Sequence, residues 1–577
     1  MGSEQEFPLV SADTASGATA LAEGLKLGAA ITPDRTAFHE HYGVRSEVEH
    51  RLAKAARGEI TWRMIMGLAS LNEHLDGLKQ LHEHGVQTGV VIDTGLIIPN
   101  WVTGLPPDLR AKAPKGTSFV LDGYEAHRAI AQAAPIMPAF NDWHIGSPYA
   151  SRNTLDAVRA GGTYHGVLSQ YTWTLPYVDD EVALVVDNVR AIGIVAAHHD
   201  HDMVVDTYLD DGPPSRFVDL ASFVGYALCE RYVVEQLCGA RYAAAFGQLE
   251  SDIPDKIALW LALDASLKSD HPSVSYVYGN TLDASEVTIA GNFAITSAEV
   301  IAFTLAERRY RTGTTILPNP ATEKIRVPTV REIMDVHEVA QTAAARSTDF
   351  ERLISWDEIE RTRDILIAGG KAFFENALAS LRSAGVNITD PVHVMLALRR
   401  LDAAEIERRF HPGPRDPSAP DVVVPLVPAE FIRRSGGLVE AEIDAVRQAG
   451  LSTAGSGRRF LVASADTHSY APGIIVSTLR QLGADVVDAG VDRNPEDLVR
   501  LAEEHGWPDI AVSAHNGQCL AFAAQLRSLL GDRDIRVYMG GRLNTLRGEQ
   551  GEPVDATDDL LKLGIIPCER PLDMLTS

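Results

Sequence analysis

The chain has 577 residues, with 52 Lys and Arg against 78 Asp and Glu, which gives a formal net charge of −26 at pH 7. Nucleic acid and anionic membrane surfaces are bound by clustered cations, so this charge argues against both as partners. A chain of this length predicts about three to five domains, or one large barrel with a further unit. The acidic N-terminus does not resemble a signal peptide, no apolar run looks as long as a membrane helix, and the four cysteines form no CxxC pair. We therefore expect a cytoplasmic protein with reduced thiols.

The first 55 residues are assigned to an N-terminal extension, and residues 56–410 then alternate apolar, strand-like runs with helical stretches. The clearest runs lie at 89–93, 136–140, 194–197, 242–246, 274–278 and 314–317. This length and repetition predict a TIM-type (β/α)8 barrel. Residues 331–410 are expected to be mainly helical and to pack outside the barrel.

Residues 411–456 are rich in Pro, Gly and Ser and indicate a linker, in which the apolar stretch 422–428 is either a strand or a docked segment. Residues 457–577 follow a regular pattern, with expected strands at 459–464, 485–490, 509–513 and 535–541. Helices are expected at 473–483, 495–505 and 520–530. This alternation predicts a parallel, doubly wound sheet of the flavodoxin-like (Rossmann-like) type, whose ligands bind at the carboxyl ends of the strands.

Polar residues and glycines stand at three of these strand ends. Asp466 and His468 follow the first strand, Ser513 ends the third, and Gly540 with Gly541 ends the fourth. A histidine on such a turn can present a ring nitrogen to a metal while a nearby carboxylate accepts its other N–H. Glycines allow the backbone to approach a bulky ligand closely. The alternative for the first turn is a polar cap on the following helix.

As a set, these residues resemble the fingerprint of the cobalamin-binding module of adenosylcobalamin-dependent mutases. Residues 457–570 are similar to the small subunit of glutamate mutase, also called methylaspartate mutase. The resemblance implies that His468 is the lower axial ligand of the cobalt and that Asp466 orients it. It also implies that Ser513, Gly540 and Gly541 form the pocket for the nucleotide tail of the cofactor.

The predicted barrel resembles the large, catalytic subunit of the same enzyme through short motifs that occur in the family's order. These motifs include Ile60-Thr-Trp-Arg63, Leu121-Asp-Gly, Tyr164-His165-Gly166, Gln170-Tyr171 with Leu175-Pro-Tyr177, and Pro320-Ala-Thr-Glu323. The chain therefore resembles both subunits fused, the large one first. The chemistry that this implies is a radical rearrangement of a carbon skeleton, which begins when the cobalt–carbon bond of adenosylcobalamin breaks homolytically.

The resemblance also implies roles for barrel residues. Arg63 would hold a substrate carboxylate, which suits the geometry of a guanidinium group. Glu323 would hydrogen-bond the adenosyl ribose, and Asp122 would lie near the adenosine where the family has asparagine. Tyr171 and Tyr177 would line the substrate cavity.

Other positions depart from the family. Its second and third substrate-binding arginines fall near Ile97 and at Trp143-His144, its amine-binding glutamate is His165, and Ala471 stands where the cobalamin fingerprint has glycine. Burying an unneutralised carboxylate against apolar groups is strongly unfavourable. The expected substrate is therefore a small carboxylic acid other than glutamate, carrying less charge.

Residues 198–202, His-His-Asp-His-Asp, form the densest group of potential metal ligands. If His198, His199 and His201 follow a barrel strand, they predict either a metal site or a polar patch that contacts substrate or adenosyl groups. Two other functions stay open, a corrinoid protein that transfers methyl groups and a cobalamin-based sensor. The resemblance further implies a homodimer.

Overall fold

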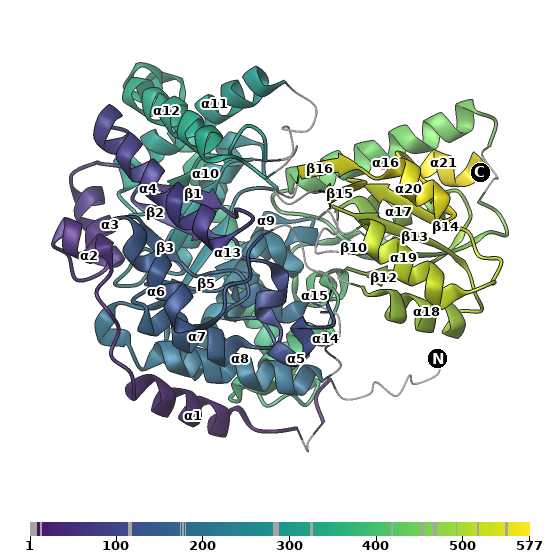
Figure 1. The fold of residues 1–577 in the computed structure, drawn as a ribbon, viewed down its shortest axis with the longest axis horizontal. Helices are drawn as coiled ribbons and strands as arrows, with labels where there is room; N and C mark the ends of the chain where they lie inside the picture. The colour runs from purple at the N-terminus through teal and green to yellow at the C-terminus, as the bar shows by residue number, and fades with distance from the viewer. Residues whose placement is uncertain are drawn as a thin grey trace. The chain divides into compact units, whose positions relative to one another are not determined.

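The computed structural model describes residues 9–11, 14–113, 118–173, 175, 178, 180–280, 288–323, 327–416, 419–451, 455–465, 470–491, 493–515, 519–547 and 552–576. The chain divides into two compact units (Figure 1). The first, called the barrel unit, comprises Met1–Pro106, Ser118–Thr172 and Asp180–Phe431. The second, called the C-terminal unit, comprises Pro107–Thr117, Trp173–Asp179 and Ile432–Ser577.

The barrel unit is built on eight parallel strands in the order β3-β2-β1-β8-β7-β6-β5-β4. An isolated parallel bridge between Phe140 and His165 joins the two outermost strands, so the sheet is nearly closed and barrel-like. This architecture is consistent with the expected (β/α)8 barrel. The strands are β1 (Thr61–Met66), β2 (Thr94–Ile97), β3 (Met137–Ala139), β4 (Tyr164–His165), β5 (Val204–Tyr208), β6 (Arg241–Phe246), β7 (Val274–Tyr278) and β8 (Thr315–Leu317).

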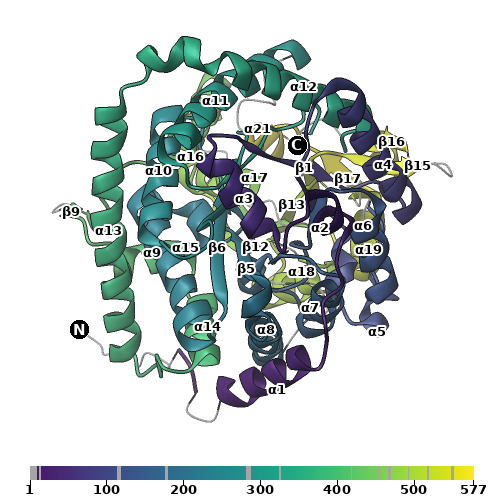
Figure 2. The ribbon, with the colours of Figure 1, turned by 90° about the vertical axis from the view of Figure 1, so that its left-hand side faces the viewer.

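Helices follow the strands and surround them (Figure 2). Two of them, α4 and α12, begin with a capping box in which a Ser or Thr and a Glu three residues later satisfy each other's backbone N–H groups. The barrel helices are α4 (Leu71–Thr88), α6 (Gly123–Ala133), α7 (Ala150–Arg159), α8 (Glu181–Ala196), α9 (Leu220–Arg231), α10 (Ile253–Ser266), α11 (Ile289–Tyr310) and α12 (Val330–Arg346). The short α5 (Pro107–Arg110) lies between β2 and α6 in the sequence but belongs to the C-terminal unit.

The helices expected over residues 331–410 are α12, α13 (Trp356–Ser383), α14 (Pro391–Arg400) and α15 (Ala403–Phe410). Of these, α13 packs against α9 and α10 outside the strands. The approach is close because glycines face side chains, and a Cβ on Gly225 would lie 2.4 Å from the ring of Phe373. This part of the chain therefore adds a second helical layer over part of the barrel.

One helix in the described part of the chain, α11, is long and apolar enough to cross a membrane, which the sequence analysis did not recognise. Its buried side carries two carboxylates. Glu299 pairs with Lys256 Nζ at 2.9 Å, and Glu307 accepts a hydrogen bond from the Gly313 N–H at 2.8 Å. These bonds join α11 to neighbouring barrel elements, as expected for a helix in the outer layer of a barrel.

The apolar run at 194–197 was expected to be a strand. In the structure it is instead the end of α8. Helix α1 (Gly17–Ala29) covers the outer face of α8, and a Cβ on Gly24 or Gly28 would collide with backbone atoms of Arg190 or Ile194. A helix buried on both faces lacks the one-sided apolar periodicity by which helices are recognised. The strand prediction therefore failed because α1 was not foreseen.

The N-terminal extension folds into α1, α2 (Ala37–Tyr42) and α3 (Glu47–Ala56), and α3 packs into the N-terminal end of the barrel. Arg51 donates hydrogen bonds to the carbonyl oxygens of Gly313, Val274 and Ser275 at 2.7, 3.0 and 2.8 Å. Ser275 is the extra residue of a β-bulge in β7, where ladder hydrogen bonds are disrupted. The arginine therefore satisfies carbonyl groups that the irregular strand exposes.

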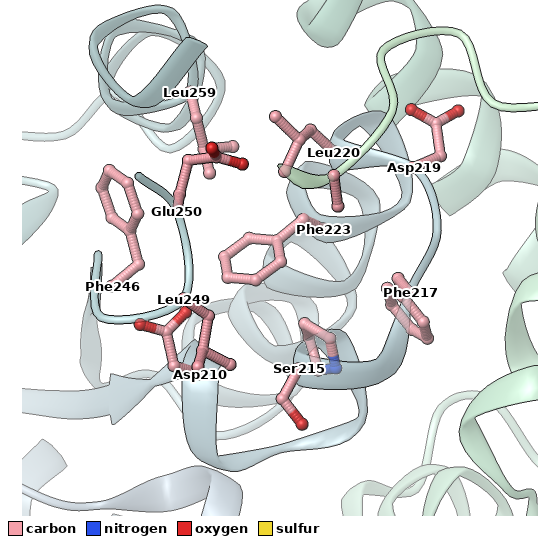
Figure 3. Close-up of a pocket in the computed structure, with 12 residues that line it drawn as sticks. Asp210, Ser215, Phe217, Asp219, Leu220, Phe223, Phe246, Leu249, Glu250 and Leu259 are labelled. Atoms are coloured by element: carbon pink, nitrogen blue, oxygen red, sulfur yellow. The ribbon is translucent and has the colours of Figure 1, made fainter. Parts of the chain in front are cut away.

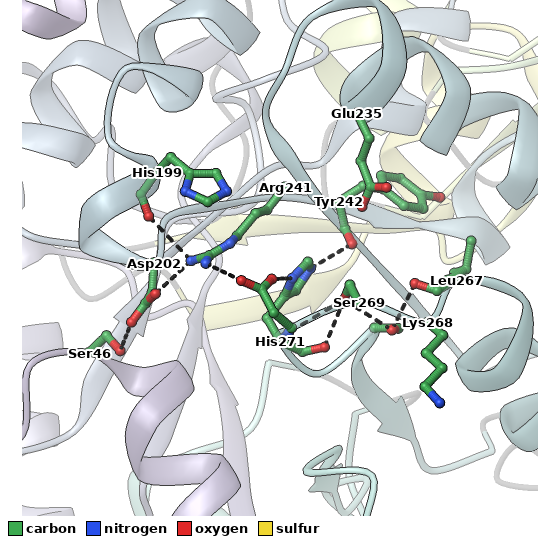
Figure 4. A network of polar contacts seen from close by, with 12 residues as sticks. Ser46, His199, Asp202, Glu235, Arg241, Tyr242, Leu267, Lys268, Ser269 and His271 are labelled. Atoms are coloured by element: carbon green, nitrogen blue, oxygen red, sulfur yellow. Dashed lines mark hydrogen bonds and ion pairs between the residues drawn. The ribbon is translucent and has the colours of Figure 1, made fainter.

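A second polar network fixes the start of α3 at the same end of the barrel (Figure 4). Ser46, the N-cap of α3, donates to Asp202 Oδ2 at 2.6 Å. Arg241 then bridges Asp202 and Asp270, with N–O distances of 2.6 Å to each carboxylate. The network joins the start of α3 to the first residue of β6 and to the segments that precede β5 and β7.

The linker docks on the barrel unit after a short hairpin of β9 (Arg415–Asp416) and β10 (Ala419–Val423). The buried carboxylate of Asp219 accepts hydrogen bonds from the N–H groups of Leu426 and Val427 at 2.8 and 3.1 Å. It also accepts one from His411 Nε2 at 2.6 Å. The stretch 422–428 is thus partly strand and partly a docked segment.

Glu250 holds a later residue of the linker, Glu430. Its carboxylate accepts hydrogen bonds from the Asp252 and Glu430 N–H groups at 3.0 and 3.3 Å, and burial raises the pKa of Glu250 to about 7. A pocket beside it is lined mainly by apolar side chains such as Phe223 and Leu249 (Figure 3). The linker is therefore attached to the barrel unit up to the first residue of α16.

The C-terminal unit contains five parallel strands in the order β12-β11-β13-β14-β17. They are β11 (Arg459–Ser464), β12 (Asp485–Gly490), β13 (Asp509–Ala514), β14 (Val537–Gly541) and β17 (Ile565–Pro567). One face packs against α16 (Glu430–Gln448), α17 (Tyr470–Gln481) and α21 (Pro571–Thr576), and the other against α18 (Pro495–Glu504), α19 (Cys519–Leu530) and α20 (Thr557–Lys562). The four expected strands are confirmed, whereas β17 and the hairpin of β15 (Asn544–Arg547) and β16 (Glu552–Asp555) were not predicted.

Replacing Asp219 with alanine should release the linker, because buried donors on Leu426, Val427 and His411 lose their acceptor. The expected cost to this contact is about 3–5 kcal/mol. Amide hydrogen exchange at Leu426 and Val427 should accelerate more than tenfold, while exchange in β6 stays unchanged. Unchanged exchange at the two linker amides would show that apolar contacts alone hold this segment.

Candidate functional site

A buried polar cluster lies inside the barrel, partway along the strands. Arg63 on β1, Tyr164 on β4, Asp206 on β5, Tyr276 on β7 and Glu47 from α3 are each at most 2% exposed. Alternate residues of a barrel strand face the interior, and both Val204 and Tyr208, which flank Asp206 at this spacing, belong to the interior core. The cluster therefore interrupts an interior that is otherwise filled by apolar and aromatic side chains.

Arg63 is held in place on two sides. Its Nε donates to Thr94 Oγ1 at 2.9 Å, and its Nη2 donates to Glu47 Oε1 at 3.0 Å. The guanidinium group also lies over the rings of Tyr276 and Tyr164, 4.9 and 5.5 Å from their centroids. Its remaining nitrogen, Nη1, has no hydrogen-bond partner among the described residues. Arg63 thus presents one fixed, unused donor to the interior.

Other buried atoms of this cluster also lack hydrogen-bond partners within the described part of the chain. They are Glu47 Oε2, Arg51 Nη1, Asn141 Oδ1, Tyr164 Oη and Asp206 Oδ1. Asn141 Nδ2 donates to Asp206 Oδ2 at 2.5 Å, so the unused acceptor oxygens belong to two joined side chains. Nearly all buried polar atoms in native proteins bond to protein, water or a ligand. The cluster is therefore suited to bind a polar ligand or water inside the barrel.

Tyrosines at the carboxyl ends of the strands orient two further polar residues. The Tyr278 hydroxyl donates to Glu323 and lies 2.6 and 2.5 Å from its two carboxylate oxygens, and the Tyr208 hydroxyl donates to Gln248 Oε1 at 2.6 Å. Burial raises the pKa of both tyrosines well above the ordinary value, so each hydroxyl stays protonated and donates. The predicted site residue Glu323 is therefore placed at the carboxyl end of the barrel.

Sequence reasoning missed these tyrosines. Tyr276 and Tyr278 stand two residues apart on one strand, so they share a face, and Tyr208 stacks on Tyr276 with centroids 5.9 Å apart. The spacing of the two tyrosines in the 274–278 run was a signal that their side chains share one face of a strand. Whether that face points into the barrel is decided by the register of the barrel strands.

Asp122 also lies on the carboxyl side of the barrel, directly before α6 in the segment that follows β2, and it is exposed. No cationic side chain stands at the positions where the family has its second and third substrate-binding arginines. Ile97 packs outward among the helices, and Trp143 packs on Gly104. His144 is buried with Nε2 2.9 Å from the Nε2 of His127, and burial lowers its pKa well below the ordinary value.

Two other predicted residues, His165 and Tyr171, lie apart from the polar cluster. His165 follows the inward-facing Tyr164 on β4 and so faces the helices, where its Nε2 contacts a backbone carbonyl at 3.0 Å. Burial lowers the pKa of His165 to about 3. The Tyr171 hydroxyl lies 3.4 Å from that of Tyr226 on α9. Tyr177 lies outside the described residues.

The interpretation of the histidine-rich segment is wrong. His198 follows α8 with Nε2 2.9 Å from the Gly28 carbonyl, and His199–His201 form a 3-10 turn before β5. The segment therefore lies at the N-terminal end of the barrel, opposite the carboxyl ends of the strands. In the described ranges no three His, Cys, Asp or Glu side chains are grouped to hold a metal ion, and all of residues 198–202 fall within those ranges.

In the C-terminal unit, small residues line up at the carboxyl edge of the sheet. Ser513 pairs in register with Ser464 on one side and Gly540 on the other, and Gly541 pairs with Ala514. The Ser513 hydroxyl is buried without a hydrogen-bond partner among the described residues. The structure therefore brings together three of the residues predicted to form the tail pocket.

Both glycines are required by their surroundings. A Cβ on Gly540 would lie 2.9 Å from the Cys568 carbonyl oxygen, and one on Gly541 would lie 2.5 Å from that of Ala514. Gly541 also has a φ of +95°, which side-chain-bearing residues rarely adopt.

Asp466 and His468 lie outside the described residues, between Ala465 and the start of α17. Ala465 donates its N–H to the Ser513 carbonyl at 2.8 Å, so the chain leaves β11 directly beside Ser513. Ala471 belongs to the first turn of α17, where its φ is negative. An alanine in place of the family's glycine is therefore accommodated at this position.

Neither the protein-family models nor the curated proteins contain a match to this chain. The function is therefore inferred from the residues and their geometry, and the resemblance to glutamate mutase stays a prediction.

Replacing Glu47 with alanine should destabilise the barrel unit by about 3–5 kcal/mol, because Arg51 and Arg63 would stay buried without their shared carboxylate. Urea unfolding measures this loss. Glu49→Ala is the matched control, since Glu49 is exposed on the same helix and, among the described residues, accepts only the Arg45 N–H. It should cost below about 1 kcal/mol. Equal losses in the two variants would show that Glu47 does not hold Arg63.

Proposed function

We propose that the protein is an adenosylcobalamin-dependent carbon-skeleton mutase of the glutamate-mutase type, with both functional parts in one chain. The observation that carries the proposal is the edge of the C-terminal sheet where Ser513, Gly540 and Gly541 lie together. In this proposal the C-terminal unit is a flavodoxin-like cobalamin-binding domain. The barrel unit holds the substrate, and the enzyme works as a cytoplasmic homodimer.

The strand order supports a ligand site at this edge. Counted along the unit, the five strands run 2-1-3-4-5, and sheets of this order bind ligands at the carboxyl ends, where the direction of the connections reverses. The Ser513 hydroxyl, which has no hydrogen-bond partner among the described residues, can bond a polar atom of an inserted ligand. His468 follows β11 in the sequence with Asp466 two residues earlier, a combination that suits a metal ligand and the carboxylate that orients it.

The barrel residues supply the complementary functions. When bound, adenosylcobalamin supplies a carbon radical, and the task of the protein is to bind, orient and exclude water. Glu323, oriented by Tyr278, can accept hydrogen bonds from ribose hydroxyls, and Asp122 lies on the same side of the barrel. Arg63 Nη1 and the Tyr164 hydroxyl can donate to a substrate carboxylate.

The geometry of Arg63 favours a substrate with little charge. Two of its three nitrogens are used by Thr94 and Glu47, so it offers one donor nitrogen and no bidentate fork. At the positions of the family's two other substrate-binding arginines, this chain has the apolar Ile97 and the Trp143-His144 pair. We therefore propose a small carboxylic acid other than glutamate as substrate.

Anaerobic reconstitution with adenosylcobalamin tests the function. Binding should change the ultraviolet–visible spectrum, and the correct small carboxylic acid should produce a paramagnetic EPR signal that is absent before its addition. Glutamate should produce neither the signal nor methylaspartate. In His468→Ala, coupling of a histidine nitrogen to cobalt should disappear while the protein stays folded.

Binding without a signal for any acid would instead favour the methyl-transfer or sensor function. Persistence of the nitrogen coupling in His468→Ala would show that another residue is the lower ligand.

Removing the Ser513 hydroxyl tests the tail pocket. Ser513→Ala should weaken adenosylcobalamin binding about fivefold to tenfold, the value of one hydrogen bond, without loss of folded protein. Ser456→Ala, an exposed serine before the same sheet, is the control and should bind as the wild type does. Equal affinity in the two variants, measured by spectroscopic titration, would remove Ser513 from the pocket.

A further inference from the structure

The buried cluster around Arg63 contains as many carboxyl groups as guanidinium groups. Arg51 and Arg63 carry two positive charges, and Glu47 and Asp206 supply two carboxyl groups that interact with them. All four residues are 0% exposed. Burying an additional uncompensated charge is strongly unfavourable. A carboxylate that binds at Arg63 therefore requires one of the two carboxyl groups to become neutral.

Glu47 is the shared partner of both guanidinium groups. Its Oε1 lies 3.0 Å from Arg63 Nη2 and 3.6 Å from Arg51 Nη1, so two guanidinium groups stabilise its negative charge. Opposite charges at this distance favour the ionised form of a carboxyl group. Glu47 is therefore already committed to these two ion pairs.

Asp206 has different surroundings. It forms no ion pair within 4 Å among the described residues, and Asn141 Nδ2 is the donor to its Oδ2 while its Oδ1 has no hydrogen-bond partner there. Besides the two arginines and Glu47, the titratable groups that interact with it are Tyr164 on β4 and Tyr276 on β7 in the cluster, and Tyr242 on β6, whose hydroxyl points to Glu230 of α9. Burial raises the pKa of Asp206 to about 6, against the opposing effect of Arg63.

We infer that Asp206 takes up one proton from solvent when a small carboxylate binds at Arg63, and that it thereby sets the charge of the substrate that the barrel accepts. The inference rests on the proposed role of Arg63 and deepens it. A protonated Asp206 would also carry an O–H donor beside Asn141 Oδ1, which has no donor among the described residues.

The pH dependence of binding follows from the direction of this coupling. The bound anion raises the pKa of Asp206 further because like charges repel. Below the pKa of the free protein Asp206 is already protonated, so the affinity is constant. Between the free and bound pKa values binding takes up a proton, so the Kd rises with pH by up to about tenfold per unit.

Isothermal titration calorimetry of the full chain with isobutyrate as the probe tests the inference. Titrations at neutral pH in phosphate and in Tris, which differ in ionisation enthalpy, should show close to one proton taken up per bound anion. The Kd should rise with pH above 6 as described. Asp206→Asn, a neutral isostere, should bind isobutyrate with no proton uptake and a Kd that does not change with pH.

Glu230→Gln is the matched control. Glu230 is also a buried acid, with a pKa raised to about 7, but it lies on α9 and accepts the Tyr242 hydroxyl outside the cluster. This variant should keep the proton uptake of the wild type.

Three results would overturn the inference: binding without proton uptake, uptake that persists in Asp206→Asn, or no binding of isobutyrate, acetate and 3-methylbutanoate. If Asp206→Asn does not fold, the proton count and pH slope of the wild type decide alone. The titration needs no cobalamin, so its failure and a failure to bind the cofactor are separate outcomes.

Discussion

The carboxylate of Glu47 holds the centre of the barrel unit together. It lies between Arg51 of its own helix and Arg63 of β1, and it joins α3 to the interior of the strands. Two guanidinium groups buried side by side repel each other and lose their hydration, so they require this shared anion. Because α3 fills the N-terminal end of the barrel, polar ligands are directed to the carboxyl end, where Tyr278 and Glu323 lie.

The same interaction limits the proposed binding of a substrate at Arg63. In the family that the sequence resembles, arginines hold a dicarboxylate, whereas here the remaining arginine already shares its charge with Glu47 and its Nε with Thr94. Asp206 adds a second carboxyl group nearby. The interior of the barrel therefore offers hydrogen-bond donors with little net positive charge. This is the physical basis for proposing a substrate with less charge than glutamate.

The C-terminal unit was largely predictable from its sequence. Its central strands are continuous apolar runs bounded by turns, as expected for parallel strands covered on both faces. The 459–464 and 485–490 strands were predicted at their exact bounds. The last strand, β17, has three residues and includes a proline, so it carries too little pattern to be recognised. Ser513, Gly540 and Gly541 were placed correctly because strand ends in such a sheet meet at one edge.

The sequence by itself determined the strand–helix alternation, the linker and the residue types at the strand ends. Only the tertiary structure decided which way side chains point. His165 and Tyr171 face the helices because Tyr164 takes the inward position on β4 and the chain then leaves the strand. Asp206 could not be found from the sequence, since an aspartate within an apolar strand becomes significant only when Arg63, 143 positions earlier, faces it across the barrel. Contacts between distant strands depend on register and closure, which local sequence patterns do not encode.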